Sequence, residues 1–181
     1  MSQLTVYADN NPTQPTFSGE EVEEISARLA RVGVRFERWA AAEEVSAQMS
    51  QEEIMAAYRA DIDRIKAEGG YQTVDVVSMY PTHPDRAAFR QKFLFEHRHT
   101  EDEVRFFVAG QGLFYLHIEG EVYEVLCTRE DLISVPANTP HWFDMGSAPS
   151  FTAIRFFNNV EGWVAHATES DIARRFLGSP L

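Results

Sequence analysis

A succession of short hydrophobic segments, each closed by a turn signal, runs through the chain from Phe93 onward. The turn signals between them are GQG, EGE, TRED, PANTP and GSAPS. Strands are predicted near residues 93–99, 103–109, 112–118, 121–127, 131–135, 141–145 and 151–158. Regularly spaced short strands with turn residues between them are typical of a β-sandwich or a barrel, so we expect this half of the chain to be mainly β.

The first half of the chain carries helix signals as well as strands. Ser18 with Glu21, and Ser50 with Glu53, match the capping box, in which the two side chains satisfy free backbone N–H groups at a helix start. Apolar residues at helical spacing follow each pair. Helices are therefore predicted over about 22–32, 51–69, 83–90 and 170–176, and strands over 4–8, 34–39 and 73–80.

Charge and composition exclude several classes of function. The chain has 181 residues, a net charge of −12 and no cluster of Lys or Arg, which argues against a nucleic-acid partner. No segment approaches the length of a membrane span, and the N-terminus lacks the pattern of a signal peptide. Cys127 is the single cysteine and cannot form an internal disulfide. We expect a cytoplasmic monomer with no membrane partner, in which Cys127 is a small buried apolar residue.

Two histidines stand close together in the stretch HRHTEDEVRFFVAG. His97 and His99 lie two residues apart, so on a strand both side chains point to the same face. A turn would bring in the next strand, on which Glu103 and Arg105 share a face. His141, in VPANTPHW, is distant in the chain, but strands distant in sequence are often neighbours in a barrel. An isolated HxH pair is common on exposed strands, whereas HxHxxxE together with PxNxPH is far more specific.

Three imidazoles and one carboxylate suit a first-row divalent metal ion. Imidazole favours Fe, Ni, Cu or Zn, and the carboxylate shifts the preference toward iron. Four protein ligands leave two positions of an octahedron open, so a substrate could bind there through two oxygens. The sequence therefore predicts a metal centre built from His97, His99, Glu103 and His141.

The same segments resemble the two motifs of the cupin superfamily. HRHTEDEVRFFVAG matches the first and VPANTPHW the second, and the resemblance implies the same four ligands. Gln91, Glu130 and Asn138 stand where these motifs usually have glycine, and Met145 stands where they usually have asparagine.

The cupin resemblance also implies the fold. We expect one cupin-type domain over residues 1–181, mainly β, folded as a double-stranded β-helix (jelly-roll barrel) with several α-helices. A helical N-terminal part would cover about 1–92, the metal-binding barrel about 93–160, and a tail 161–181.

A closer resemblance, to the acireductone dioxygenase family, covers nearly the whole chain. It rests on FLFEHRHTEDEVRFFVAGQGLFYLHI, DLISVPANTPHWFDMG and AIRFF, with DVVSMYP before them. It implies one Fe(II) or Ni(II) per chain and cleavage of acireductone (1,2-dihydroxy-3-keto-5-methylthiopentene) with O₂ in methionine salvage. The iron form is implied to give formate and 4-methylthio-2-oxobutanoate. The nickel form is implied to give 3-methylthiopropanoate, formate and carbon monoxide.

Several residues are candidates for substrate binding. Arg105 shares the face of Glu103, so it is expected to point toward the substrate and could stabilise an enolate oxygen, although a surface ion pair is the alternative in so acidic a chain. Arg155 is a second candidate. Phe93, Phe143 and Trp163 could form an apolar pocket for the methylthio group, with plain core packing as the alternative.

Two other functions fit the same barrel. A cupin sugar isomerase would need basic residues for a phosphate, and the segments expected to line the site are rich in Phe instead. A non-enzymatic ligand-binding cupin would usually adjoin a DNA-binding module, and no basic helix-turn-helix is visible. Oxygen uptake with acireductone would separate the three functions. The remaining histidines lie outside the motifs and are expected to be structural or exposed: His83, His117 and His166.

Overall fold

The computed structural model describes residues 1–176, and residues 177–181 of the expected tail lie outside the described part. The strands are β1 (Gln3–Ala8), β2 (Pro15–Gly19), β3 (Arg35–Arg38), β4 (Thr73–Met79), β5 (His97–Arg98), β6 (Glu103–Ile118), β7 (Glu121–Thr128), β8 (Asp131–Val135), β9 (His141–Asp144), β10 (Ser150–Phe157) and β11 (His166–Ala167). The helices are α1 (Val22–Arg31), α2 (Gln51–Ala57), α3 (Arg59–Gly69), α4 (Arg86–Phe93) and α5 (Ile172–Arg175), with a 3-10 helix η1 (Val160–Trp163).

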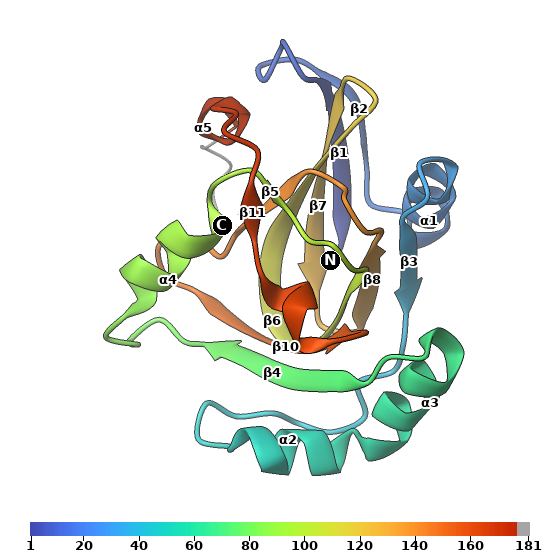
Figure 1. Ribbon diagram of the computed structural model, residues 1–181, viewed down its shortest axis with the longest axis vertical. Helices are drawn as coiled ribbons and strands as arrows, with labels where there is room; N and C mark the ends of the chain where they lie inside the picture. Colours follow the sequence, from blue (N-terminus) through green and yellow to red (C-terminus); the bar gives the residue numbers. More distant parts are fainter. Residues whose placement is uncertain (177–181) are drawn as a thin grey trace.

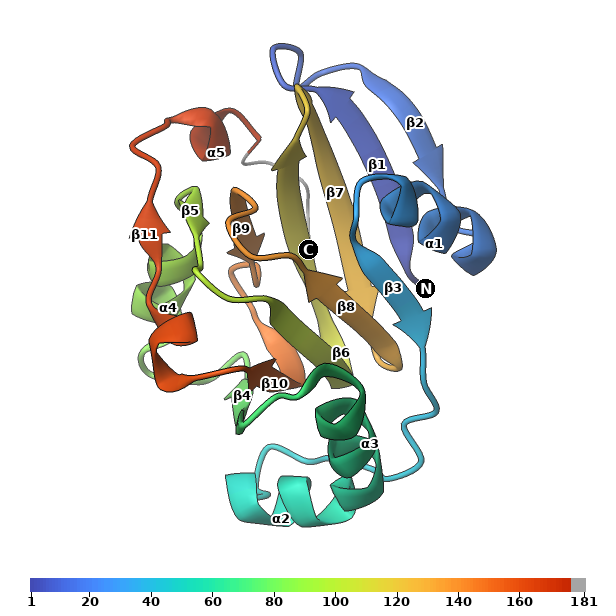
Figure 2. The ribbon, with the colours of Figure 1, turned by 45° about the vertical axis from the view of Figure 1, so that its right-hand side comes forward.

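Strand β6 runs through two groups of antiparallel strands. Its first half pairs with β8 and β10, and its second half pairs with β7 and β9. β3 and β4 extend the first group, β1 and β2 extend the second, and β5 and β11 join through β9. Figures 1 and 2 show these strands wrapped around a common interior, with α2 and α3 packed outside β4 and α1 beside β3. The expected mainly β barrel with helices is confirmed.

The bend in β6 falls at Gly110, whose φ of 65° lies in the left-handed region. A Cβ at this position would lie 1.8 Å from the main-chain oxygen of Ser150 on β10, so only glycine fits. The prediction of two strands, 103–109 and 112–118, was therefore wrong in detail. GQG bends one continuous strand instead of ending it.

Alternation along β6 separates two hydrophobic layers. Phe107 points into the barrel, where it packs with other aromatic rings at centroid distances of 6.2 to 6.5 Å. These rings belong to Phe114, Phe143 and Phe151. Phe106 points outward beneath α2 and α3, against Trp39 and Tyr58. Within residues 1–176, no helix combines the length and apolar character that crossing a membrane would require.

One of the two expected capping boxes is present. The Glu53 backbone N–H donates to Ser50 Oγ at 3.1 Å, and the Ser50 backbone N–H donates to the Glu53 carboxylate at 2.7 Å. The box predicted at Ser18 was wrong, because residues 15–19 pair with β1 as a hairpin and α1 begins after Glu21 with no side-chain cap. The helix predicted over 51–69 divides at Tyr58 into α2 and α3.

Replacing Ser50 by alanine should lower the free energy of unfolding by about 1 kcal/mol, because the Glu53 backbone N–H at the start of α2 loses its acceptor, Ser50 Oγ. Urea denaturation would measure this loss. Ser18→Ala is the matched control, since Ser18 caps no helix, and it should change the free energy by less than about 0.5 kcal/mol. Equal losses in the two variants would contradict a stabilising role for the box.

The helix predicted from His83 begins at Arg86 and continues to Phe93. Phe93 was therefore placed wrongly on a strand, and the strand predicted over 93–99 is reduced to β5. Gln91 lies inside α4, where the backbone does not need the glycine that cupin motifs usually carry at this position.

Candidate metal centre

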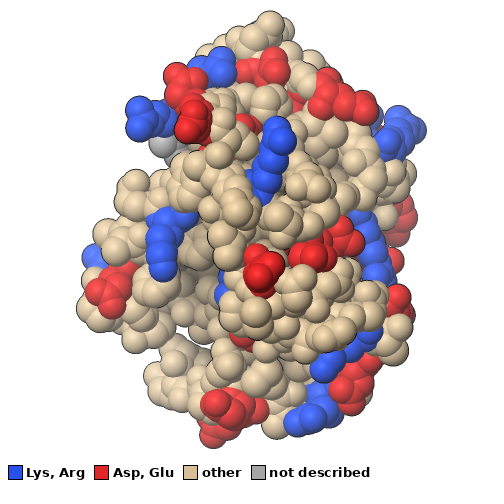
Figure 3. Space-filling model, viewed as in Figure 1, with Lys and Arg blue, Asp and Glu red and all other residues tan. Residues whose placement is uncertain are grey.

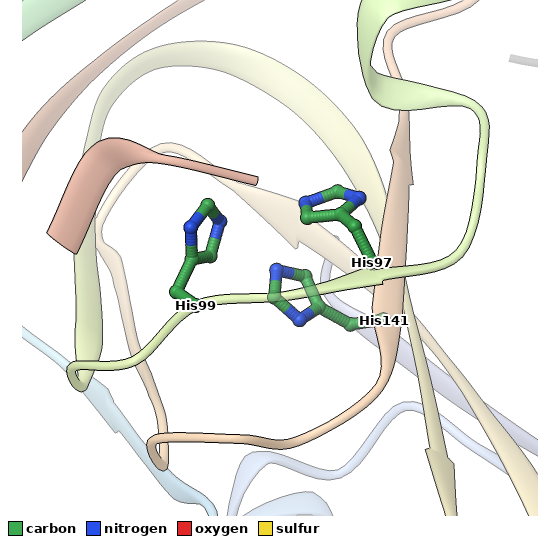
Figure 4. A group of neighbouring side chains, drawn as sticks. All are labelled: His97, His99 and His141. Atoms are coloured by element: carbon green, nitrogen blue, oxygen red, sulfur yellow. The ribbon is translucent and has the colours of Figure 1, made fainter. Parts of the chain in front are cut away.

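Three histidines from two parts of the chain converge inside the barrel (Figure 4). His97 on β5 stands opposite His141 on β9 in the strand register, and His99 follows two residues after His97. Their potential ligand atoms all lie within 4.8 Å of one another. The ring centroids are 4.5 to 5.2 Å apart, and all three residues are buried. This group of imidazoles could hold one metal ion.

A main-chain oxygen fixes the orientation of each ring. The acceptors are Phe95 for His97 (2.8 Å), Val164 for His99 (3.0 Å) and Thr139 for His141 (2.8 Å). A carbonyl oxygen only accepts hydrogen bonds, so each Nδ1 must carry a proton. In the neutral rings the Nε2 lone pairs then remain free. This is the arrangement in which an imidazole binds a metal through one nitrogen while the other nitrogen is held by the protein.

Glu103, at the start of β6, faces two of these nitrogens. Its Oε2 atom lies 3.1 Å from His99 Nε2 and 3.2 Å from His141 Nε2. A carboxylate oxygen against two lone pairs is unfavourable unless a cation is shared among them. The donor set therefore fits a divalent metal ion.

The site favours neutral imidazole and ionised carboxylate. Burial, together with His141 and His99 nearby, lowers the pKa of His97 to about 3. Burial alone would raise the pKa of Glu103, but the positive charge of Arg105 opposes it, and this pKa lies well below its usual range. Both groups therefore have the protonation state that metal binding requires at neutral pH.

Two loops are joined beside the metal-binding groups. The Ala137 backbone N–H donates to Asp102 Oδ1 at 2.8 Å, and the Asn138 backbone N–H donates to the His99 main-chain oxygen at 2.8 Å. Asn138 and Glu130 have φ values of 63° and 82°, so these positions keep the left-handed backbone that the usual glycines would adopt. The two sequence motifs are thereby linked in space.

Arg105 lies beside the histidines, as the alternation of β6 predicts. It is 4% exposed, its Nε donates to Glu103 Oε1, and its guanidinium lies 4.9 and 5.0 Å from the ring centroids of Phe114 and Phe143. A buried arginine held by one nitrogen keeps further N–H groups for a ligand. The alternative of a surface ion pair is thus wrong for this residue.

A cavity of about 420 Å³ opens beside His97 and His99. The other lining residues come from β4, α4 and the segment that follows it, β6, β10 and the segment around η1: Val77, Phe89, Lys92, Phe93, Phe95, Arg105, Arg155, Trp163 and Ala165. On the face drawn in Figure 3 the surface is hollowed between the regions of α4 and η1, and Lys or Arg side chains reach its edge. The cavity combines aromatic walls with positive charge.

Arg155 on β10 and Trp163 on η1 also line the cavity. Arg155 makes two hydrogen bonds to Asp75 on β4, at 2.9 and 2.6 Å, and its guanidinium lies 5.6 Å from the Trp163 ring centroid. Asp75 was not a candidate from the sequence, because a single acidic residue in a strand carries no motif. Its pairing partner becomes visible only in the register of β4 with β10.

Phe93 and Phe143 occupy different layers. Phe93 lines the cavity from the end of α4, whereas Phe143 is 1% exposed and lies one layer deeper, with its ring 6.3 Å from that of Phe93. Phe89 and Lys92 also line the cavity and were missed, because the predicted helix ended near Arg90 and a strand was expected from Phe93, whereas α4 continues through Phe93.

The other histidines and the cysteine lie apart from this group. His117 lies between Glu96 at 2.7 Å and Asp9 at 3.2 Å, and His166 is exposed on β11. His83 Nδ1 accepts a backbone hydrogen bond from Asp85. Burial raises the pKa of the Cys127 thiol well above its usual value, so it is protonated and unreactive at neutral pH.

Comparisons with known proteins all point to the same family over most of the chain. Residues 3–165 match the model of the ARD/ARD' family. A protein from Synechococcus named acireductone dioxygenase is 61% identical over 97% of this chain and 98% of its own length. One of the same name from Pseudomonas aeruginosa is 62% identical over 97% of each chain.

A solved structure is similar as well. Acireductone dioxygenase from Bacillus anthracis, with a cadmium ion in its active centre, superposes with a TM-score of 0.78 and 31% identity. The superposition covers 91% of this chain and 97% of that one. This likeness confirms the expected cupin-type fold.

Proposed function

We propose that this chain, which belongs to the ARD/ARD' family, is a metal-dependent acireductone dioxygenase. The family match confirms the resemblance drawn from the sequence motifs. The structural observation that carries the proposal is the convergence of three histidines, each fixed at Nδ1 by a main-chain oxygen, at one side of a substrate-sized cavity. Acireductone and O₂ would be the substrates, in methionine salvage.

His97, His99, Glu103 and His141 would hold one Fe(II) or Ni(II) per chain. Three neutral imidazoles and one carboxylate accept either ion and leave positions free for a ligand. When bound, the ion would supply Lewis acidity toward the enediolate oxygens and would influence which carbons react with O₂. Cadmium in the active centre of the Bacillus anthracis protein supports a divalent site in this fold.

The cavity walls would bind and orient the rest of the substrate. Arg105 would donate N–H groups to an enolate oxygen, because its guanidinium is buried at the cavity and already held by Glu103. Phe93 and Trp163 would pack on the methylthio tail and exclude water from the reacting atoms. Arg155, oriented by Asp75, would contribute positive charge to the cavity wall.

Exchange of the metal should change the products made by this one chain. We expect the iron form to yield 4-methylthio-2-oxobutanoate and formate, and the nickel form to yield 3-methylthiopropanoate, formate and carbon monoxide. Iron exchanges electrons with O₂ readily, whereas nickel in nitrogen and oxygen ligation acts mainly as a Lewis acid.

The experiment uses protein stripped of metal and reloaded separately with Fe(II) or Ni(II). Oxygen uptake with acireductone tests the activity itself, and gas and acid analysis identifies the products. Carbon monoxide should appear with nickel alone. The absence of oxygen uptake in both forms would contradict the proposed activity. Identical products from both forms would leave the activity in place and contradict metal control of the products.

A further inference from the structure

Helix α4 forms one wall of the cavity and brings a charged residue to it. Phe89, Lys92 and Phe93 all line the cavity, on a helix that has no buried residue of its own. The bidentate ion pair of Arg90 with Asp144 on β9, at 2.8 and 2.9 Å, holds the helix against the barrel. α4 therefore presents Lys92 from a fixed support to a cavity that opens toward solvent.

The positive charges around the cavity differ in their partners. Arg105 is paired with Glu103, and Arg155 is paired with Asp75 through two hydrogen bonds. Lys92 is exposed and lies in no ion pair among residues 1–176. Its contact is with the ring of Phe89, whose centroid lies 5.5 Å from the ammonium nitrogen. Lys92 is thus the cavity cation whose charge no acidic side chain offsets.

We propose that Lys92 is the residue that draws the anionic substrate into the cavity. The inference rests on the proposed function, because acireductone is a conjugated enediol that loses a proton to give an anion. The chain as a whole carries a net charge of −12 and repels such an anion at long range. An unpaired ammonium group at the cavity opposes that repulsion where the substrate must enter.

Charge and packing can be separated at this position. The cation–π contact with Phe89 would also stabilise α4, and a purely structural role would depend on the lysine stem rather than on its charge. Lys92→Arg keeps the charge, Lys92→Gln removes it and Lys92→Glu reverses it. Because the side chain is exposed, none of these changes creates a buried defect.

The experiment measures kcat and kcat/KM with the iron-loaded protein at ionic strengths from about 0.01 M to about 0.15 M, over which the Debye length falls from about 30 Å to about 8 Å. Binding of acireductone under anaerobic conditions gives a second readout that does not depend on turnover. The chain has just two lysines, so Lys66→Gln on α3 is a matched control.

At low ionic strength, Lys92→Gln should lower kcat/KM and anaerobic affinity by about 3- to 10-fold, and Lys92→Glu by more. The salt dependence of kcat/KM should flatten in Lys92→Gln and reverse in Lys92→Glu, while kcat and metal content stay close to the wild-type values in both. The Lys92→Arg and Lys66→Gln proteins should resemble the wild type in all of these measurements. Wild-type kinetics in Lys92→Gln, or equal losses in Lys92→Gln and Lys92→Arg, would overturn the role of Lys92. A wild type that neither binds nor oxidises acireductone would overturn the proposed function as well.

Discussion

Alanine in place of His97, His99 or His141 is expected to remove the bound metal and abolish oxygen uptake with acireductone. Each substitution deletes one imidazole from a group whose ligand atoms lie within 4.8 Å of one another, and the remaining groups form a weaker chelate that is open to water. The aromatic core of the barrel lies elsewhere, so the fold should persist. Elemental analysis and an oxygen electrode measure the two losses.

Thermal unfolding distinguishes loss of a ligand from loss of the fold. Added metal should raise the Tm of the stripped wild type, because the ion binds the folded state alone, and should not raise the Tm of the three variants. His166→Ala is the matched control, since this histidine is exposed on β11, and it should behave like the wild type. Full metal occupancy with normal turnover in any of the three variants would refute the assignment of that histidine.

Replacing Arg105 by lysine is expected to lower kcat/KM by about 10²-fold, the scale associated with losing one transition-state hydrogen-bond donor. Lysine keeps the positive charge beside Glu103 but lacks the planar fork that can hold Glu103 and a substrate oxygen together. Metal content should stay at the wild-type level, because the carboxylate keeps a cationic neighbour.

Arg98→Lys is the control for this change, since Arg98 lies exposed on β5 between two of the histidines. Its kinetics should match the wild type. If Arg105→Lys loses metal, the arginine acts by holding Glu103 in place rather than by contacting the substrate. Unchanged kinetics would remove Arg105 from both roles.

The barrel and the grouping of the histidines follow from local patterns in the sequence. Strand alternation predicted that Glu103 and Arg105 share a face, and the structure confirms it through their hydrogen bond. The same rule failed for Phe93, which reaches the cavity from a helix. The spacing of apolar residues in FRQKFLF fits both the helical and the strand periodicity, and tertiary packing decides between the two structures.

Other features could not be predicted from local sequence patterns, because they depend on tertiary packing. Ser18 carries a capping pattern but pairs in a hairpin, because strand pairing outweighs a local cap. The pair of Asp75 with Arg155 depends on the register of two strands far apart in the chain. Phe143 and His141 lie two residues apart on β9 and so share a face of the strand. This pattern does not predict how deeply a ring is buried, and the ring of Phe143 lies beneath the cavity wall.

The three imidazoles are held by main-chain oxygens, and this affects which sequence changes the site can tolerate among related proteins. Every residue carries the same carbonyl group, so substitutions at Phe95, Thr139 and Val164 change side chains without deleting an acceptor. As hydrogen-bond acceptors, these three positions depend on the path of the backbone and not on their side chains. Substitution of a histidine removes a metal ligand, whereas substitution of a residue that orients one leaves the main-chain acceptor in place. A distant relative could therefore keep the same metal geometry with none of those three side chains in common.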